Sequence, residues 1–240
     1  EGGAIDTGTN DLYIGRGSIN SNTYFFNGLI DEVKIYNTAL TQEEILIDYN
    51  HGAAMVMGAT STAADGTTAD NSSDRSYCVP GDTSTCSPPV AEWKMDENTG
   101  TTSTYDSSGN GFTGTLTSIT ESSWVPGKYG SALNLDGSSD YVSVTDATDS
   151  SLDVTDSLTM SVWVKTTSGD NEGLIYKGDF SGTQGTYQIH LKSSTTVPVI
   201  RLNQSASEGS GQLTGNTTVN DGNWHHIAAT YDKTNIKLYI

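Results

Sequence analysis

Short runs of alternating apolar and polar residues recur along the chain, and they predict β-strands. In SLTMSVWVKT, residues Leu158, Met160, Val162 and Val164 are spaced two apart, which places them on one face of a strand. Similar alternation occurs in DLYIGRG, YQIHLKS, VPVIRLNQ and WHHIAATYDKTNIKLYI. Because such runs recur roughly every 10 to 15 residues without a long helical pattern between them, they predict an all-β fold built as an antiparallel β-sandwich.

Turn and capping signals predict how some of these strands are connected. Asn27-Gly28 and Asp136-Gly137 are dipeptides typical of tight turns, so we expect SALNLDGSSDYVSV to form a hairpin around Asp136-Gly137. In TQEE, Thr41 and Glu44 have the spacing of a capping box. The sequence therefore predicts a short helix over residues 41–50.

Composition divides the chain into three regions. Between two strand-rich regions, 1–50 and 90–240, residues 51–89 include GATSTAADGTTADNSSD, which is small, polar and acidic and has no periodicity. Such a segment buries too little apolar area to offset its ordering entropy, so residues 51–89 are predicted to be a linker.

Charge excludes one class of partner. The 240 residues include 29 acidic and 11 basic side chains, a net charge of −18, which would repel nucleic acid. The surplus carboxylates are available to a hard cation such as calcium. No apolar run approaches the ~20 residues that a membrane helix needs, so we expect no membrane insertion within these residues.

The two cysteines lie in the predicted linker. Cys78 and Cys86 are spaced too widely for a zinc-binding pair, and no second pair exists. They predict a local disulfide, and hence an oxidising, extracytoplasmic setting. The alternative is that both are free thiols.

Several ordered motifs resemble a known family. WKMDENTGTTSTYDSSGNGFTGTL, GKYGSALNLDGSSDYVSV, SLTMSVWVKT and DGNWHHIAATYD resemble, in that order, the first three-quarters of a concanavalin A-like lectin/glucanase domain of the laminin G-like type. FNGLIDEVKIYNTALTQEEI resembles the last quarter of the same domain, although it comes first in this chain. The resemblance covers roughly residues 5–50 and 90–240, and it implies a jelly-roll sandwich.

The order of these motifs suggests one unit of a tandem array, cut out of phase. We therefore expect residues 1–50 to close the sandwich formed by residues 90–240, as in a circular permutant. The alternative is that residues 1–50 pair with a preceding domain, or are exchanged between molecules.

The resemblance also implies a structural calcium ion near the loop DSSGNG. Asp96, Asp106 and Asn110 are the candidate ligands there, and Asp31 is a candidate from the first region. On strict alternation Asp31 shares a face with Leu29, Val33 and Ile35, so its carboxylate needs a cation or several donors. The alternative is that a bulge turns Asp31 to solvent and that DSSGNG is only a turn.

No catalytic constellation is evident. The adjacent acids Asp31 and Glu32 point apart on a strand, no E-x-D-x-x-E run is present, and no nucleophile elbow occurs. His225 and His226 also face opposite sides, so we expect one of them to be packed and the other exposed. The sequence therefore predicts that the chain is not an enzyme.

Aromatic residues give no assigned ligand site. Tyr141, Tyr176 and Trp124 are candidates for stacking on sugar rings, but most aromatic residues of a sandwich are expected in its core. We expect a non-catalytic carbohydrate- or protein-binding adhesion module from a tandem-repeat bacterial protein, located extracellularly or at the cell surface. The expected partners are a glycan or surface protein and neighbouring laminin G-like repeats. The alternatives are a structural spacer without ligand and an accessory module of a glycoside hydrolase.

Overall fold

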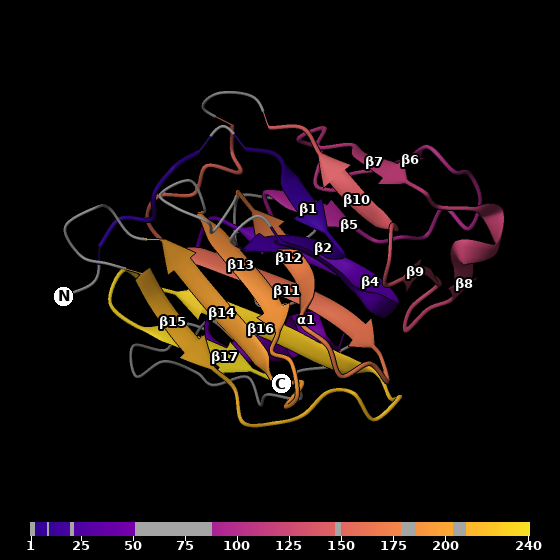
Figure 1. Cartoon of the computed structure of the whole chain (residues 1–240). Helices are drawn as coiled ribbons and strands as arrows, with labels where there is room; N and C mark the ends of the chain where they lie inside the picture. Colours follow the sequence, from indigo (N-terminus) through magenta and orange to yellow (C-terminus); the bar gives the residue numbers. More distant parts are fainter. Residues whose placement is uncertain are drawn as a thin grey trace, which may run out of the picture.

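The computed structural model describes residues 3–8, 10–19, 22–50, 88–146, 150–178, 186–203 and 210–240. Within these residues two antiparallel sheets pack face to face around one large apolar core, which confirms the predicted all-β sandwich. Figure 1 shows the two layers, with β12 to β15 of one sheet in front of β11, β16 and β17 of the other.

The first layer is an eight-stranded sheet. In sheet order its strands are β15 (Ser210–Thr214), β14 (Pro198–Asn203), β13 (Tyr187–Leu191), β12 (Glu172–Lys177), β1 (Leu12–Ile14), β10 (Tyr141–Val144), β7 (Gly114–Thr117) and β6 (Ser103–Thr104). A separate hairpin of β2 (Arg16–Ile19) and β3 (Asn22–Phe25) lies against β12 of this sheet.

The second layer is a seven-stranded sheet. In sheet order its strands are β17 (Ile236–Tyr239), β16 (His225–Tyr231), β11 (Leu158–Lys165), β4 (Asn27–Tyr36), β9 (Ser131–Asp136) and β8 (Trp124–Pro126), and β5 (Ala91–Trp93) also pairs with β4. The helix α1 (Gln42–Tyr49) and the short 3-10 helix η2 (Glu121–Ser123) complete the described elements.

Strands from the first fifty residues lie inside both sheets. In the eight-stranded sheet β1 pairs with β10 on one side and β12 on the other, and in the seven-stranded sheet β4 lies between β9 and β11. Figure 1 shows the indigo β1 between the later strands. The buried ammonium of Lys177 on β12 also donates to the carbonyl oxygens of Gly8 and Asn10. Both sheets are therefore continuous only because of these early strands.

Two apolar clusters follow the strand alternation. Leu158, Met160, Val162 and Val164 all lie in the main core between the sheets, as predicted. A smaller cluster on the other face of the seven-stranded sheet joins Tyr36 and Ala228 to Leu40 and Ile45, so α1 covers that outer face. The predicted capping box is present at the start of α1: Glu44 N–H donates to Thr41 Oγ1, and Thr41 N–H donates to Glu44 Oε2.

A β-bulge overturns the prediction that Asp31 shares a face with Val33 and Ile35. Glu32 has a positive φ of 50°, and the pairing of β4 with β11 shifts between Ser161 and Trp163. Val33 and Ile35 therefore point into the core, whereas Asp31 is paired with Trp163 on the outer face. The expected alternative, in which a bulge turns Asp31 to solvent, is also wrong, because Asp31 is completely buried there.

Two predictions made from turn dipeptides are wrong, because neither dipeptide forms a hairpin turn. Asp136-Gly137 ends β9 of one sheet, and the chain then enters β10 of the other sheet, so the segment is a crossover and not a hairpin. The dipeptide Asn27-Gly28 forms the start of β4 and pairs with β9. Dipeptide signals describe the local backbone and do not tell which strand the chain meets next.

Candidate functional site

One row of side chains crosses the whole outer face of the eight-stranded sheet. Directly opposed residues on neighbouring strands share a face, so the pairing register places these eight side chains in line. The row runs Ser103, Thr115, Ser143, Tyr13, Tyr176, Gln188, Arg201 and Gln212. None of the eight is acidic, although acids outnumber basic residues in the chain by 29 to 11. We call this set the polar row.

The β2–β3 hairpin covers the middle of the polar row through glycine contacts. A Cβ on Gly17 would lie 2.8 Å from the Tyr176 ring, and one on Gly173 would lie 2.3 Å from the backbone nitrogen of Gly17. The hairpin therefore sits directly on β12, and the hydroxyl of the buried Tyr176 donates to the carbonyl of Ser18.

At the open end of the hairpin, the side chain of Arg16 lies over two tyrosine rings of the sheet. The guanidinium carbon of Arg16 is 4.7 Å from the Tyr13 ring centroid and 4.9 Å from that of Tyr141. The two rings are 6.0 Å apart in an edge-to-face arrangement, and Phe25 lies 6.1 Å from Tyr141. All four side chains are half-buried. We call Tyr13, Arg16, Phe25 and Tyr141 the arginine–tyrosine site.

A cavity adjoins the arginine–tyrosine site. Its volume is ≈ 170 Å³, and it is lined by Asn10, Tyr13, Arg16, Gly17, Ser18, Tyr176 and Gly178. Burial and the charge of Asp11 raise the pKa of the Tyr13 hydroxyl, so this group stays protonated and can donate a hydrogen bond at neutral pH. At ~30 Å³ per water molecule the cavity has the size of about six waters, well below the ≈ 300 Å³ of drug-sized pockets.

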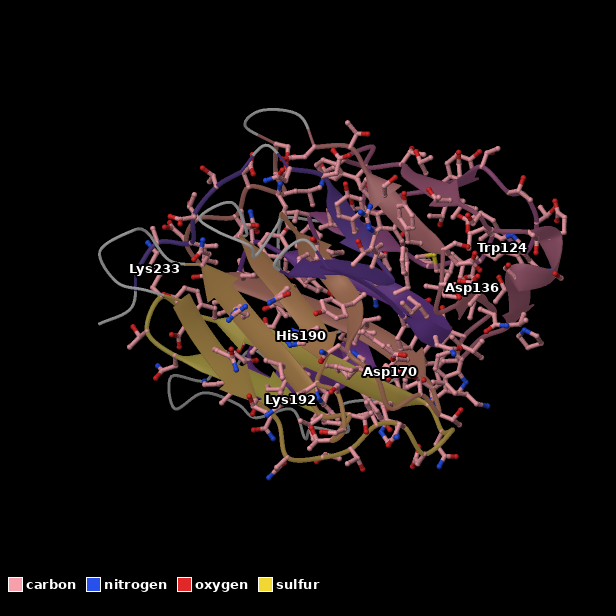
Figure 2. All side chains as sticks on the ribbon, viewed as in Figure 1. Trp124, Asp136, Asp170, His190, Lys192 and Lys233 are labelled. Atoms are coloured by element: carbon pink, nitrogen blue, oxygen red, sulfur yellow. The ribbon has the colours of Figure 1, made fainter. Side chains whose placement is uncertain are left out.

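Further along the same face, buried polar atoms lack hydrogen-bond partners. Within the described residues, neither amide atom of Gln188 has a partner, nor does Nδ1 of His190 or Oε2 of Glu172. Burial raises the pKa of Glu172 to about 7, whereas burial and the charge of Arg201 lower the pKa of His190 to about 4. His190 is therefore neutral at physiological pH. Figure 2 shows it on the eight-stranded sheet, well away from Trp124 and Asp136.

The outer face of the seven-stranded sheet is built differently, around the buried Lys34. Its ammonium is 2.6 Å from Asp48 Oδ1 of α1, with Glu32 and Glu92 at 3.5 and 3.7 Å. Asp48 Oδ2 accepts from Ser161 and contacts His226 at 3.2 Å. Burial alone would raise the pKa of Asp48, but the neighbouring Lys34 and His226 outweigh burial and lower it well below its usual value. This network fixes α1 onto the sheet.

Two predicted calcium ligands flank one loop beside that network. Asp31 Oδ2 accepts from the backbone N–H groups of Lys128 and Tyr129, and Asp96 Oδ1 accepts from that of Ser131. A Cβ on Gly130 would lie 1.8 Å from Asp96, so the approach requires glycine. Asp31 Oδ1 is buried without a hydrogen bond of normal geometry, and burial, together with the charge of Asp96, raises the pKa of Asp31 to about 7. Asp31 Oδ1 is therefore the atom of this pair whose burial a cation would offset.

The other two predicted calcium ligands act in a turn. Asp106 accepts backbone N–H groups from Glu92, Ser108 and Phe112, and Asn110 donates its amide to the carbonyl of Val90. Both oxygens of Asp106 are thus occupied by donors. Among the described residues, no group of three or more His, Cys, Asp or Glu side chains is arranged to hold a metal ion. Calcium binding stays a prediction.

Two further expectations concern the cysteines and the membrane. The predicted disulfide between Cys78 and Cys86 lies outside the described residues. Among the helices that the structure describes, none has the length and apolar character needed to cross a bilayer.

Among the described residues, His225 and His226 are not arranged in a catalytic relay. His226 is buried as expected, and it and Ser161 both contact the same oxygen of Asp48, so the imidazole is not placed as a base for the hydroxyl. His225 is half-buried and contacts Asp221 at 2.8 Å. These contacts are those of packing and of surface pairing.

The sequence alone assigned no ligand-binding residue and offered only aromatic candidates. It named Tyr141 and Tyr176, and the structure brings both near the cavity or its rim, whereas Trp124 is buried elsewhere. It missed Tyr13 and Arg16. Their signal was present, because Tyr13 lies between the buried Leu12 and Ile14 and so must point outward.

Comparison with known proteins supports the observed fold. A family model described as the concanavalin A-like lectin/glucanases superfamily matches residues 1–46 and 136–240, which together exceed half of the chain. No curated protein and no solved structure matches the chain.

Proposed function

We propose that the chain, which belongs to the concanavalin A-like lectin/glucanases superfamily, is a glycan-binding module of an extracellular bacterial protein. Membership supports carbohydrate or protein binding in general, and lectin-type domains of this kind are generally non-catalytic and typically extracellular. The choice of a glycan rests on one observation. The half-buried aromatic rings of the arginine–tyrosine site lie beside a small polar cavity on an outer sheet face.

The chemistry of the site favours sugar over protein. Sugar rings present apolar C–H faces and many hydroxyls, and aromatic rings with nearby polar groups suit both. The polar row adds hydroxyl and amide side chains on the same face. The large apolar side chains that are exposed among the described residues are Leu46, Tyr49, Tyr105 and Ile240, and none belongs to this site. An apolar protein-docking patch is therefore not found there.

A glycan array with matched variants tests the proposal. We expect the unmodified chain to bind a subset of glycans, and Tyr141→Ala to lose at least about tenfold in affinity, because a stacking ring is removed. Tyr49→Ala is the control, since Tyr49 is an exposed tyrosine on α1, which covers the outer face of the other sheet. A chain that binds no glycan would support the alternative of a structural spacer. Binding that survives Tyr141→Ala would move the site elsewhere.

A second proposal concerns how the chain forms one domain. We propose that residues 1–50 supply the last quarter of the domain whose earlier part is 90–240, with 51–89 as linker, as in one repeat of a tandem array. The support is the family match in two separated pieces and the central place of β1 and β4. A rearranged chain, with residues 90–240 followed by 1–50, should unfold at a similar temperature. If it does not fold, the proposal fails.

We also propose that calcium binds beside Asp31 and Asp96. The support is the buried Asp31 Oδ1 without a hydrogen bond and the raised pKa of this carboxyl, since a cation would offset the cost of its charge. The structure gives no such support for Asp106, whose oxygens already accept several hydrogen bonds. A ligand that binds only the folded chain raises its unfolding temperature, so melting with calcium and with chelator tests this.

The alternative role, as an accessory module of a glycoside hydrolase, would use the same binding site. A module of a glycoside hydrolase would show the same binding, and the domains encoded beside this chain in its parent protein would distinguish the two roles.

A further inference from the structure

We infer that the arginine–tyrosine site selects glycans that carry a carboxylate, of the uronic-acid class, and that Arg16 is the residue that determines this specificity. The inference rests on the proposed glycan-binding function and names its ligand class. Three observations carry it: the contacts that the Arg16 guanidinium makes, its position in the lining of the cavity, and the distribution of acidic residues over the molecule.

The guanidinium of Arg16 is held in place but has no carboxylate partner. Its contacts among the described residues are with Tyr13 and Tyr141, whose rings lie 4.7 and 4.9 Å from its central carbon. It forms no ion pair with any carboxylate of those residues, although the chain carries 29 acids. Arg16 also makes a side-chain hydrogen bond with Tyr13, and its remaining N–H groups can bind a planar anion.

Three lysines of the molecule do have an internal carboxylate partner. The buried lysines Lys34 and Lys177 lie 2.6 Å from Asp48 and Asp146, and the exposed Lys233 lies 2.8 Å from Asp156. In these cases the surplus of acids has supplied an internal partner. Arg16 instead lines a cavity open to a ligand, which makes an external carboxylate the natural partner.

The surroundings of Arg16 permit an acidic ligand. No residue of the polar row is acidic, and Arg201, the other arginine within the described residues, belongs to that row. By contrast, the acidic groups Asp31, Glu32, Asp48 and Glu92 lie on the outer side of the opposite sheet. A ligand anion at Arg16 therefore meets a polar row without carboxylates, although Asp11, whose charge acts on the Tyr13 hydroxyl, lies near it.

The geometry favours a uronate over a free anion. A sugar ring stacked on the Tyr141 side can place its carboxylate at the Arg16 edge, so that aromatic and ionic contacts are made by one residue of the glycan. The protonated Tyr13 hydroxyl, Asn10 and Ser18 then face the ring hydroxyls in the cavity.

The test compares matched acidic and neutral oligosaccharides by calorimetric titration. The probes are trimers of galacturonate, glucuronate and mannuronate, each with its neutral hexose trimer, together with hexaglutamate as an acidic peptide. We expect at least one uronate to bind at least about tenfold more tightly than its neutral counterpart. Arg16→Gln should abolish that preference, and Arg16→Lys should restore only part of it, since an ammonium lacks the planar fork. Lys237→Gln, an equal charge change on the edge strand β17 of the other sheet, should leave it unchanged.

Each outcome decides the inference. Equal binding of acidic and neutral trimers, or a uronate preference that survives Arg16→Gln, overturns it while leaving glycan binding intact. Hexaglutamate binding as tightly as the uronates also overturns it, because recognition would then be of charge on a peptide. Failure of every sugar to bind overturns this inference and the proposed function together. Circular dichroism of Arg16→Gln confirms that any loss is not caused by unfolding.

Discussion

The two outer faces of the sandwich differ in what covers them and in where their charges are. On the seven-stranded sheet α1 lies over the strands, and its Asp48 joins a buried network around Lys34. On the eight-stranded sheet a hairpin covers only the middle, and the arginine–tyrosine site, which the end of this hairpin forms with the sheet, is half-buried and adjoins a cavity. Buried carboxylates gather on the first face, whereas the polar row of the second has none.

This difference separates two tasks within one fold. Polar groups that are buried and paired with one another stabilise a single arrangement, and removing one partner leaves the other charge buried without compensation. Polar and aromatic groups that remain half-exposed without ionic partners contribute little to stability and stay available to a ligand. Substitutions on the outer face of the seven-stranded sheet should therefore mainly lower stability. Substitutions on the outer face of the eight-stranded sheet should mainly weaken ligand binding.

Removing Asp48 should produce the largest loss. In Asp48→Ala the buried ammonium of Lys34 loses its nearest carboxylate, and Ser161 and His226 lose their shared acceptor. We expect the free energy of unfolding to fall by about 3–5 kcal/mol, measured by urea denaturation at pH 7. Glu43→Ala changes an exposed acid on the same helix and should cost at most about 0.5 kcal/mol. A loss below about 1 kcal/mol for Asp48→Ala would contradict the account of the covered face.

The pH dependence of stability should be the next largest effect. Burial raises the pKa of Asp31, Glu32 and Glu172 to about 7 from ordinary values of 3.8 and 4.5. The folded state therefore holds these protons more tightly than the unfolded state. Their stabilising contribution is complete below about pH 4 and is lost as the pH rises through 7, by at most about 4 kcal/mol for any one group. Urea midpoints at pH 5 and pH 8 measure it.

Variants show which face supplies this dependence. Asp31→Asn, on the covered face, should flatten the pH profile, and Glu172→Gln provides the same comparison on the other sheet. Calcium at pH 8 should recover part of the lost stability in the unmodified chain and none in Asp31→Asn, because bound calcium favours the ionised carboxylate. Identical unfolding curves with calcium and with chelator would contradict the calcium proposal and leave the pH prediction unaffected.

The smallest effect is expected in the polar row. Thr115 is exposed on β7 near one end of that row, and Thr115→Ala should change the free energy of unfolding by no more than about 0.5 kcal/mol. Urea denaturation of Thr115→Ala and of Asp48→Ala under the same conditions compares the two outer faces directly. A loss above about 2 kcal/mol would show that the open face also serves stability.

The sequence predicted the layers and the helix well because both depend on local periodicity. Alternation in β11 specifies its inward side chains, and the capping box specifies the start of α1. Pairing between distant strands has no comparable local signal. The segment around Asp136-Gly137 reads as a hairpin, yet its two strands enter different sheets.

The candidate site was harder to predict because it depends on the register of the whole sheet. Tyr13, Tyr141 and Arg16 come from three strands, and only their pairing brings them together. The bulge at Glu32 likewise changes the face of Asp31, which strict alternation could not reveal. Family resemblance supplied the expectation of a jelly roll, but it specified neither feature.

The central place of β1 and β4 has a consequence for biosynthesis. During translation Tyr36 leaves the ribosome more than 100 residues before β11 and β12, so β4 meets β11 and β1 meets β12 only on the order of 10 s later at typical elongation rates. Until then one edge of each early strand has no partner, even where β5, β9 or β10 has already paired with the other, and such unpaired edges promote misassembly. Nascent-chain shielding by chaperones, more than the intrinsic speed of strand pairing, should therefore govern the yield of correctly assembled molecules.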